Sequence, residues 1–145
     1  MQVDFYQLAG TPAEQVIASL AEKVLASGGR LLVIADEEGF LARLDRMLWD
    51  QGAGSFLPHG LAGASEDARQ PILLSRSPDA PNRARNMLIA DGIWREAALS
   101  YDRSFYLFDS ATLEGARAAW KALSGRQEVD RHHWAQESGR WKQQA

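Results

Sequence analysis

Short, continuous apolar runs alternate along this chain with stretches in which apolar residues recur at helical spacing. The run LLVIA at 31–35 is typical of a strand that is covered on both faces. Before it, apolar residues return every three or four positions from Val16 to Leu25, which predicts a helix. Strands that alternate with helices predict an α/β fold, namely a single three-layer, Rossmann-like domain with a mostly parallel sheet. We expect the strands at 3–8, 31–35, 71–74, 87–90 and 104–108, and the helices between 12 and 27, 37 and 49, and 110 and 123.

The ends of the predicted helices carry capping signals. Thr11 can cap the first helix, Pro12 suits its first turn, and Glu14 can complete a capping box. Two glycines at 28–29 are expected to end that helix. Asp36 can cap the second helix in the same way as Thr11 caps the first.

The C-terminal part has weaker signals. The whole chain, 1–145, is expected to form one domain, because its length is typical of a single hydrophobic core. The segment from Val129 to Trp134 alternates weakly and predicts a polar edge strand. Residues from about 136 to 145 are expected to form a mobile tail unless Trp141 docks.

Composition excludes several classes of protein. The chain has no cysteine, so it has neither a disulfide framework nor a thiolate metal site. Asp4 interrupts the first apolar run, which does not fit a signal peptide. No apolar run approaches the roughly 18 residues that a membrane-spanning helix needs. We therefore expect a cytoplasmic protein without a membrane partner.

The net charge of −3 is unevenly distributed. Residues 1–114 carry 10 Lys and Arg against 16 Asp and Glu, whereas residues 115–145 carry 6 against 3. The acidic body disfavours duplex DNA, and an acidic partner is expected to dock on the C-terminal fifth. Arg83 and Arg85 cluster in a proline-containing loop, where a solvated loop is favoured over a phosphate contact.

A Rossmann-like fold raises the question of a nucleotide cofactor. Such a site needs several glycines in the first strand-to-helix turn, so that the backbone can approach a pyrophosphate. Here that turn has Gly10 followed by Pro12, which lacks an N–H group, and the lysine of a phosphate-binding loop is missing. Asp36 suits a ribose contact, but its capping role is favoured. We expect a scaffold without a cofactor.

Catalytic and metal chemistry are also weakly signalled. His132 and His133 are adjacent, so on a strand they point to opposite faces and cannot bind one metal ion together. The simpler interpretation is two surface histidines. His59 has no partners at a spacing that indicates a catalytic triad. One alternative remains an enzyme, a Rossmann-like nucleotide-binding protein or hydrolase that uses Asp36 and His59 across the strand ends.

Two groups of side chains suggest binding. Trp49 and Phe56 flank a glycine turn, where core filling and a partner surface are comparably favoured. Arg117, Trp120 and Lys121 share one side of the third predicted helix, because positions three and four apart are neighbours. An aromatic ring between two cations offers an apolar seat together with a positive charge.

The most distinctive block of the chain is Leu48-Trp49 followed, after a short gap, by Ser55-Phe56-Leu57-Pro58-His59. In this block the sequence resembles the chi subunits of the bacterial DNA polymerase III holoenzyme. Weaker marks extend over essentially the whole chain. They are Phe5-Tyr6, Asp91-Gly92, Phe108-Asp109, and Arg117 with Trp120-Lys121.

This resemblance implies a non-catalytic accessory subunit in DNA replication. Family members link the clamp-loader assembly to the single-stranded-DNA-binding protein by holding its acidic, Phe-ended C-terminal tail, and so reach single-stranded DNA indirectly. The tail site would include Arg117, Trp120 and Lys121. Family members also pair with a psi subunit through a surface that matches Trp49 and Phe56. The protein is accordingly expected to be a monomer or a heterodimer.

Two features depart from the family pattern. Many members have Tyr where this chain has Trp120, and the gap between Trp49 and Ser55 is glycine-rich here. A second alternative, a direct single-strand DNA binder, usually needs a positive groove with stacking aromatic residues. The acidic balance of most of this chain disfavours that alternative.

Overall fold

The apolar runs of the sequence form one sheet in the computed structural model of this protein, which describes residues 1–50, 57–137 and 140–144. Over these residues the sheet has eight strands in the order β3-β4-β2-β5-β6-β1-β7-β8. Neighbouring strands are parallel except for the pair β7 and β8. The strands are β1 (Gln2–Gln7), β2 (Leu31–Ile34), β3 (His59–Leu61), β4 (Ile72–Ser75), β5 (Asn86–Ile89), β6 (Arg103–Phe108), β7 (Asp130–Glu137) and β8 (Arg140–Gln144).

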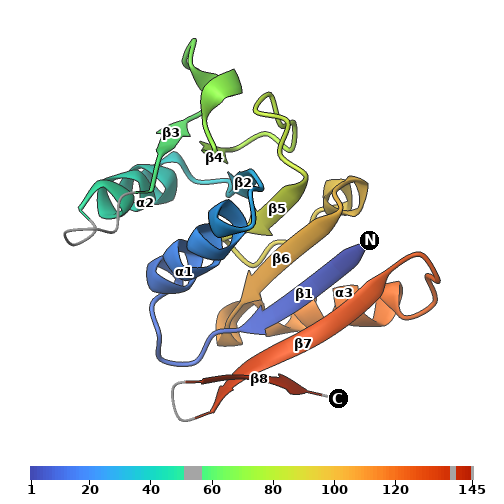
Figure 1. Cartoon of the computed structure of the whole chain (residues 1–145). Helices are drawn as coiled ribbons and strands as arrows, with labels where there is room; N and C mark the ends of the chain where they lie inside the picture. Colours follow the sequence, from blue (N-terminus) through green and yellow to red (C-terminus); the bar gives the residue numbers. More distant parts are fainter. Residues whose placement is uncertain (51–56, 138–139, 145) are drawn as a thin grey trace.

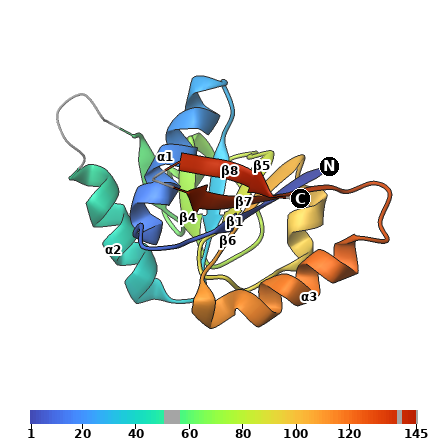
Figure 2. The ribbon, with the colours of Figure 1, turned by 90° about the horizontal axis from the view of Figure 1, so that it is seen from below.

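Three α-helices in the described part of the chain cover the two faces of the sheet. They are α1 (Ala13–Ala26), α2 (Glu38–Trp49) and α3 (Leu113–Leu123). Figure 1 and Figure 2 show α1 and α3 on opposite sides of the strands. This arrangement confirms the predicted α/β fold with a mostly parallel sheet. None of the described helices is both long and apolar enough to cross a membrane.

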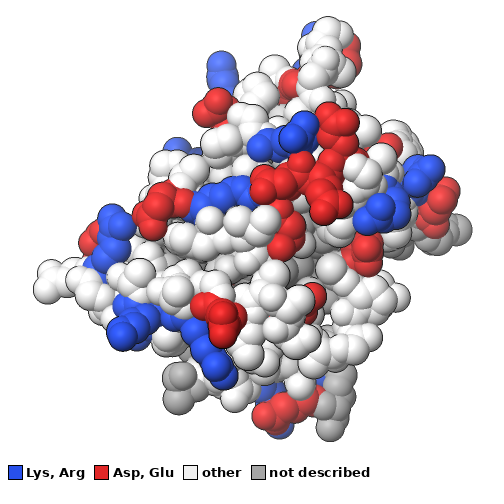
Figure 3. Space-filling view, turned by 180° about the vertical axis from the view of Figure 1, so that it is seen from behind, with Lys and Arg blue, Asp and Glu red and all other residues white. Residues whose placement is uncertain are grey.

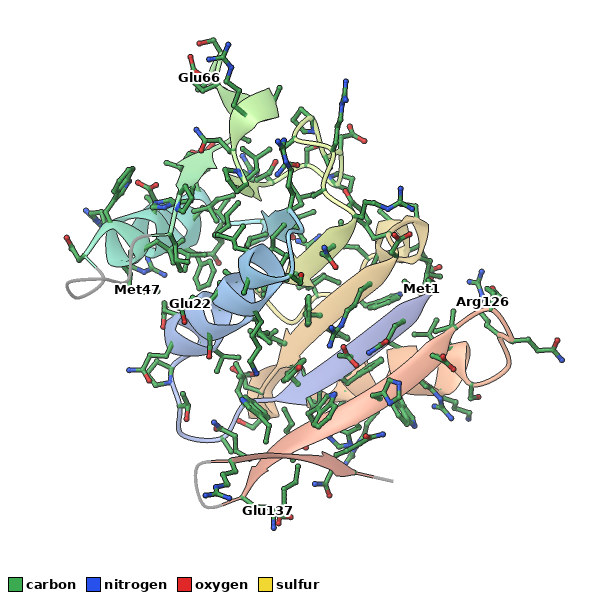
Figure 4. All side chains as sticks on the ribbon, viewed as in Figure 1. Met1, Glu22, Met47, Glu66, Arg126 and Glu137 are labelled. Atoms are coloured by element: carbon green, nitrogen blue, oxygen red, sulfur yellow. The ribbon has the colours of Figure 1, made fainter. Side chains whose placement is uncertain are left out.

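The strand period of two divides the core into two layers. On β2, Leu31 and Val33 pack in the layer that contains α1 and α2, whereas Leu32 and Ile34 pack in the layer that contains α3. Both sides of this strand are therefore buried, as its continuous apolar sequence predicts. Figure 4 shows the side chains on both sides of the sheet.

The predicted helix caps are only partly correct. Gly28 has a φ of +83°, and the N–H groups of Gly28 and Gly29 donate to the carbonyls of Leu25 and Val24, so the glycines end α1 as expected. At the other end, Pro12 is the cap residue and no side chain caps the helix, so the prediction for Thr11 is wrong.

The prediction for Asp36 is wrong for a different reason. Glu37 is the cap residue of α2, and its side chain makes no cap hydrogen bond. The Asp36 carboxylate instead accepts a hydrogen bond from Arg95, which lies far along the chain. A long-range ion pair has replaced the local cap.

The end of the chain differs most from the prediction. The segment 129–134 does not form an edge strand, because β7 lies between β1 and a further strand, β8. Trp141 on β8 packs at 88° against Tyr6, with ring centroids 5.0 Å apart. Trp134 stacks on the same Tyr6, and its Nε1 lies 3.4 Å from Oδ1 of the buried Asp4.

Candidate functional site

A cavity of about 250 Å³ lies between α3 and the sheet. The parallel register places its residues side by side, because Phe5 on β1 is opposite His133 on β7, and Gln7 on β1 is opposite Phe108 on β6. On α3, helical spacing brings four further positions to the same side. The lining consists of Phe5, Gln7, Phe108, Leu113, Ala116, Arg117, Trp120 and His133.

Aromatic rings form much of the wall of this cavity. The Phe5 ring lies 5.1 Å from the Trp120 ring at an angle of 87°, and 6.4 Å from the Phe108 ring at 71°. These edge-to-face contacts fit the favourable alignment of ring edges and faces. Ala116, which is buried, has a small side chain facing them from α3. A small residue opposite large rings leaves space that an apolar group can fill.

Arg117 contributes a positive charge to the lining of this cavity. It is exposed, and among the residues that the structure describes it has no hydrogen-bond or ion-pair partner. Among the described residues the lining includes no carboxylate, so none of them neutralises the guanidinium within the cavity. Figure 3 views the face that carries α3, where blue Lys and Arg atoms lie at the lower left and the main cluster of red Asp and Glu atoms lies higher.

Lys121 follows Arg117 by one turn of α3 and is also exposed, but it does not line the cavity. Trp120 points inward and is half-buried. The three predicted residues therefore have different positions. Arg117 and Trp120 belong to the cavity, whereas Lys121 can only reach a ligand that extends along the helix.

Arg131 holds Trp120 in place from β7. Its guanidinium carbon lies 4.0 Å from the centroid of the indole ring, and its Nη1 donates to the Trp120 carbonyl at 2.6 Å. A cation over the face of an indole is favourable, and the additional hydrogen bond fixes the geometry. Sequence reasoning missed this residue, because Arg131 and Trp120 belong to different elements.

His133 was also missed as a site residue. The sequence-based interpretation as a surface histidine is wrong, since His133 is half-buried and its Nε2 lies 3.0 Å from Gln7 Oε1. The amide oxygen can only accept, so Nε2 carries the hydrogen in this arrangement. Burial lowers the pKa of His133 below its ordinary value of 6.5. Alternation along β7, with Trp134 on the opposite face, is the signal that could have found it.

The second predicted surface begins at the end of α2. Trp49 is 56% exposed, and its ring lies 4.7 Å from the ring of the buried His59. The Nε2 atom of His59 lies 3.0 Å from Asp45 Oδ1, and its Nδ1 lies 2.7 Å from the Leu57 carbonyl oxygen. Trp49 thus lies at the surface and packs against a buried, hydrogen-bonded histidine. Phe56, its predicted companion, lies outside the described residues.

The carboxyl ends of β2 and β5 are where a nucleotide would bind in a fold of this type. This position holds an ion-pair cluster in which Arg95 lies 2.9 Å from Asp91 Oδ1 and 2.6 Å from Asp36 Oδ1. Burial by itself lowers the pKa of Arg95, but the hydrogen bonds to both carboxylates outweigh it and the pKa is raised. Burial likewise raises the pKa of Asp91, and the bonds from Arg95 and two backbone N–H groups outweigh it, so that pKa is lowered.

Asp36 and His59 do not meet. Asp36 is bound to Arg95, whereas both ring nitrogens of His59 are bound near the end of α2. Among the described residues there is also no group of three His, Cys, Asp or Glu side chains that could hold a metal ion. The residues suggested for an enzyme are therefore occupied in separate structural contacts.

Three curated relatives of this chain share one description. The relative from Escherichia coli strain K12, DNA polymerase III subunit chi, is 32% identical over 77 residues, covering 53% of this chain and 52% of the relative. The proteins of that name from Pseudomonas aeruginosa and Haemophilus influenzae are 33% identical over 91 residues and 28% over 76. These matches cover 61% and 52% of this chain, and 62% and 53% of the relatives.

The chain therefore spans between about half and 62% of the length of the curated relatives that it matches. The model of the family described as "DNA polymerase III chi subunit, HolC" matches residues 1–129. That match includes α3 and its Arg117 and Trp120, and it ends just before β7, which supplies His133 to the cavity wall and Arg131 to the contact with Trp120. The chain belongs to the DNA polymerase III chi subunit family.

Proposed function

We propose that this protein is a non-catalytic accessory subunit of the DNA polymerase III holoenzyme, acting in DNA replication. In this role it links the clamp-loader assembly to the single-stranded-DNA-binding protein by holding the acidic, Phe-ended C-terminal tail of that protein. Family membership supports the accessory role. The observation that carries the tail site is an aromatic cavity with an unpaired arginine beside it.

The cavity suits a phenylalanine side chain. An apolar cavity of about 150 Å³ is large enough to bind benzene, and this one has about 250 Å³. The rings of Phe5, Phe108 and Trp120 can contact a bound ring at their faces and edges. Burial of a full Phe side chain contributes roughly 1.5–3 kcal/mol. This apolar contact explains why the ligand should end in Phe.

Arg117 suits the terminal carboxylate next to that ring. A guanidinium can donate two parallel hydrogen bonds to a carboxylate, and Arg117 has no competing partner in the described part of the chain. Lys121, one turn further along α3, adds a mobile charge for the acidic residues that precede the Phe. The ring and the carboxylate of the same terminal residue are thus recognised together.

Calorimetric titration with a synthetic acidic peptide ending in Phe tests this proposal. We expect binding that weakens as salt is added, because the acidic residues act through screened charges. Amidation of the C-terminus should weaken it further, because it removes the carboxylate that faces Arg117. The variant Arg117→Glu should lose at least ~2 kcal/mol of binding, about 30-fold in affinity.

The matched control for Arg117→Glu is Arg43→Glu on α2, which makes the same change of charge away from the cavity. This control should bind the peptide almost as well as the wild type. Equal affinity for wild type and Arg117→Glu would place the tail site elsewhere. Binding lost equally in both variants would show that only the net charge matters.

The same function includes a partner surface for a psi subunit or another clamp-loader subunit at Trp49. The exposed indole at the end of α2 supports this part of the proposal. Trp49→Ala should weaken assembly with a co-expressed psi subunit in size-exclusion chromatography. It should cost the free protein no more than about 1 kcal/mol, whereas truncation of a buried Trp costs about 3–5 kcal/mol. The control is Ile93→Ala, an exposed apolar residue elsewhere, and equal assembly of both variants would remove Trp49 from the interface.

A further inference from the structure

A second cavity, of about 710 Å³, lies at the opposite ends of the parallel strands, where β2 and β5 begin. Its lining, over the described residues, contains three arginines, Arg30, Arg83 and Arg85, and one carboxylate, Asp102. Arg30 directly precedes β2 and Arg85 directly precedes β5. Because Leu31 pairs with Asn86 in the parallel ladder, these two arginines come at matching positions on neighbouring strands.

Arg30 and Arg85 are held in place by the protein itself. Nη1 of Arg30 donates to the carbonyls of Ala68 and Asn82, both at 3.0 Å. These acceptors are uncharged, so the positive charge of Arg30 is not cancelled. Arg85 donates two hydrogen bonds to Asp102, at 2.5 Å and 3.0 Å. The lining of the cavity therefore keeps a net positive charge.

The third arginine is held in an uncommon backbone conformation. Arg83 has a φ of +60°, in the left-handed region, where an ordinary L-residue costs roughly 1–2 kcal/mol. Asn82, fully buried, fixes this turn, because its side-chain amide donates to the carbonyls of Leu31 and Gln70 and accepts from the Ala84 N–H. Glycine would adopt the same backbone more easily. The exposed Arg83 side chain has no ion-pair or hydrogen-bond partner within the described ranges.

The residues around this cavity do not repel an anion. The cavity adjoins the end of α1, whose last carbonyls would repel negative charge if they were unpaired. The N–H groups of Gly28 and Gly29 already bond two of these carbonyls. In the part of the chain that the structure describes, no aromatic ring and no large aliphatic side chain lines the cavity. Recognition at this place must come from charge and hydrogen bonds.

We propose that this arginine cavity binds the phosphodiester backbone of single-stranded DNA, weakly and without preference for sequence. Guanidinium groups suit phosphate oxygens because they donate two hydrogen bonds in a fixed plane. Because the described lining has no aromatic ring on which a base could stack, we expect it to contact only the sugar-phosphate backbone. The described lining also offers no large apolar side chain, which disfavours a peptide that binds through apolar side chains. This site lies away from α3 and does not depend on the tail site.

Fluorescence anisotropy with a labelled oligothymidylate tests the proposal. For single strands the logarithm of the binding constant falls with the logarithm of the salt concentration, with a slope of about −0.7 for each phosphate contacted. Three arginines predict a slope near −2, so affinity should fall roughly 20-fold between about 50 and about 200 mM salt. An excess of inorganic phosphate at constant ionic strength should compete only weakly if the extended backbone is the ligand.

Two variants of Arg83 separate the site from a general charge effect. Arg83→Glu should weaken oligonucleotide binding and make the slope of log affinity against log salt concentration shallower by about 0.7 or more. The control Arg43→Glu should have a smaller effect on both the affinity and this slope. Arg83→Gly keeps the left-handed turn, so it should weaken binding without lowering the thermal midpoint. Arg117→Glu should leave oligonucleotide binding intact, and Arg83→Glu should leave peptide binding intact, so each site can fail without the other.

Three results would overturn the proposal. One is a wild-type protein that does not bind the oligonucleotide even at low salt. Another is an equal loss in Arg83→Glu and Arg43→Glu, which would indicate net charge alone. The third is full competition by inorganic phosphate, or by a polyglutamate peptide of matched charge, which would assign the cavity to a different anion.

Discussion

The α3 cavity and the carboxyl ends of β2 and β5 use the same kinds of residue in opposite ways. At the strand ends, Arg95 lies between Asp36 and Asp91 and forms an ion pair with each of them. In the α3 cavity, Arg117 lies beside aromatic rings, and the described residues of the wall include no carboxylate. One arginine stabilises the fold, and the other remains available for a ligand.

The same difference separates the usual nucleotide position of this kind of fold from the cavity of the proposed tail site. The position at which such folds usually bind nucleotides is filled by an internal ion-pair cluster. The available apolar space lies instead beneath α3, where Ala116 faces Phe5 and Phe108. Under the proposed function, the position of the ligand site depends on which charges are paired and on the size of the side chains, and the topology of the sheet alone does not indicate it.

The largest expected effect is on stability, from Arg95→Ala. The side chains of Arg95 and Asp91 are only 15% and 18% exposed, so the variant leaves a carboxylate without its partner in a partly buried place. We expect a loss of about 3 kcal/mol in the free energy of unfolding, measured with urea.

Two controls complete the Arg95 experiment. Arg69→Ala removes a pair with Glu66 whose side chains are 86% and 59% exposed, and it should cost less than about 0.5 kcal/mol. Arg117→Ala, which removes no ion pair in the described residues, should cost similarly little. If all three variants are equally stable, the contrast between a structural arginine and a ligand-binding arginine is wrong.

A smaller effect is expected in the pH dependence of stability. Burial lowers the pKa of His133 in the folded state below 6.5, so the unfolded chain binds more protons once the pH falls below that value. Stability should therefore decrease as the pH falls from neutral through 6.5 towards the lowered pKa. The pKa of Asp91 is lowered from 3.8, so its contribution is present above 3.8 and is lost only when the pH falls further.

Urea denaturation at a series of pH values separates these two regions. His133→Gln should remove part of the loss that begins near 6.5, while the loss that begins below 3.8 should remain. Asp91→Asn should have the opposite pattern. A wild-type curve that His133→Gln leaves unchanged would mean that the cavity histidine contributes nothing to this titration.

Peptide binding should depend on the same histidine, though more weakly. Under the proposed function a carboxylate enters the cavity that His133 lines, and a nearby negative charge favours the protonated ring. Binding should therefore take up protons and become tighter as the pH is lowered from about 8 towards 6. Titrations in buffers of different ionisation enthalpy measure this uptake, and His133→Gln should abolish it. Uptake that persists in the variant would come from another group.

No effect at all is expected from nucleotides. The ion-pair cluster at the ends of β2 and β5 occupies the position where a nucleotide would bind. Thermal-shift measurements with ATP, GTP, NAD and divalent metals should give no saturable stabilisation. A specific rise in the thermal midpoint that saturates at micromolar ligand would contradict the contrast between the two regions and favour the nucleotide-binding alternative.

Local patterns in the sequence predicted much of the fold. The apolar runs located strands β1, β2, β4, β5 and β6 to within a residue or two, and the glycines at 28–29 correctly ended α1. Burial on both faces of β2 followed from its unbroken apolar run. These features depend on neighbours in the chain, and the hydrophobic period records them directly. Strand β3 was missed because its three residues, starting at His59, are too few to show a period.

The candidate site was only half visible in the sequence. Helical spacing alone placed Arg117 and Trp120 on one side of α3. The opposite wall comes from β1, β6 and β7, whose register brings Phe5, Phe108 and His133 together. That register is set by hydrogen bonds between strands that are distant along the chain, so no local pattern contains it.

The sequence by itself determined the α/β class, the lack of cysteine chemistry and the family to which the chain belongs. Tertiary structure decided which charges are paired. Asp36 looked like a helix cap and Arg117 like one of many surface cations, and only the fold places Arg95 against Asp36 and leaves Arg117 beside a ring-lined cavity. The physical reason is that pairing and burial depend on distances in space, whereas propensity and period depend on distances along the chain.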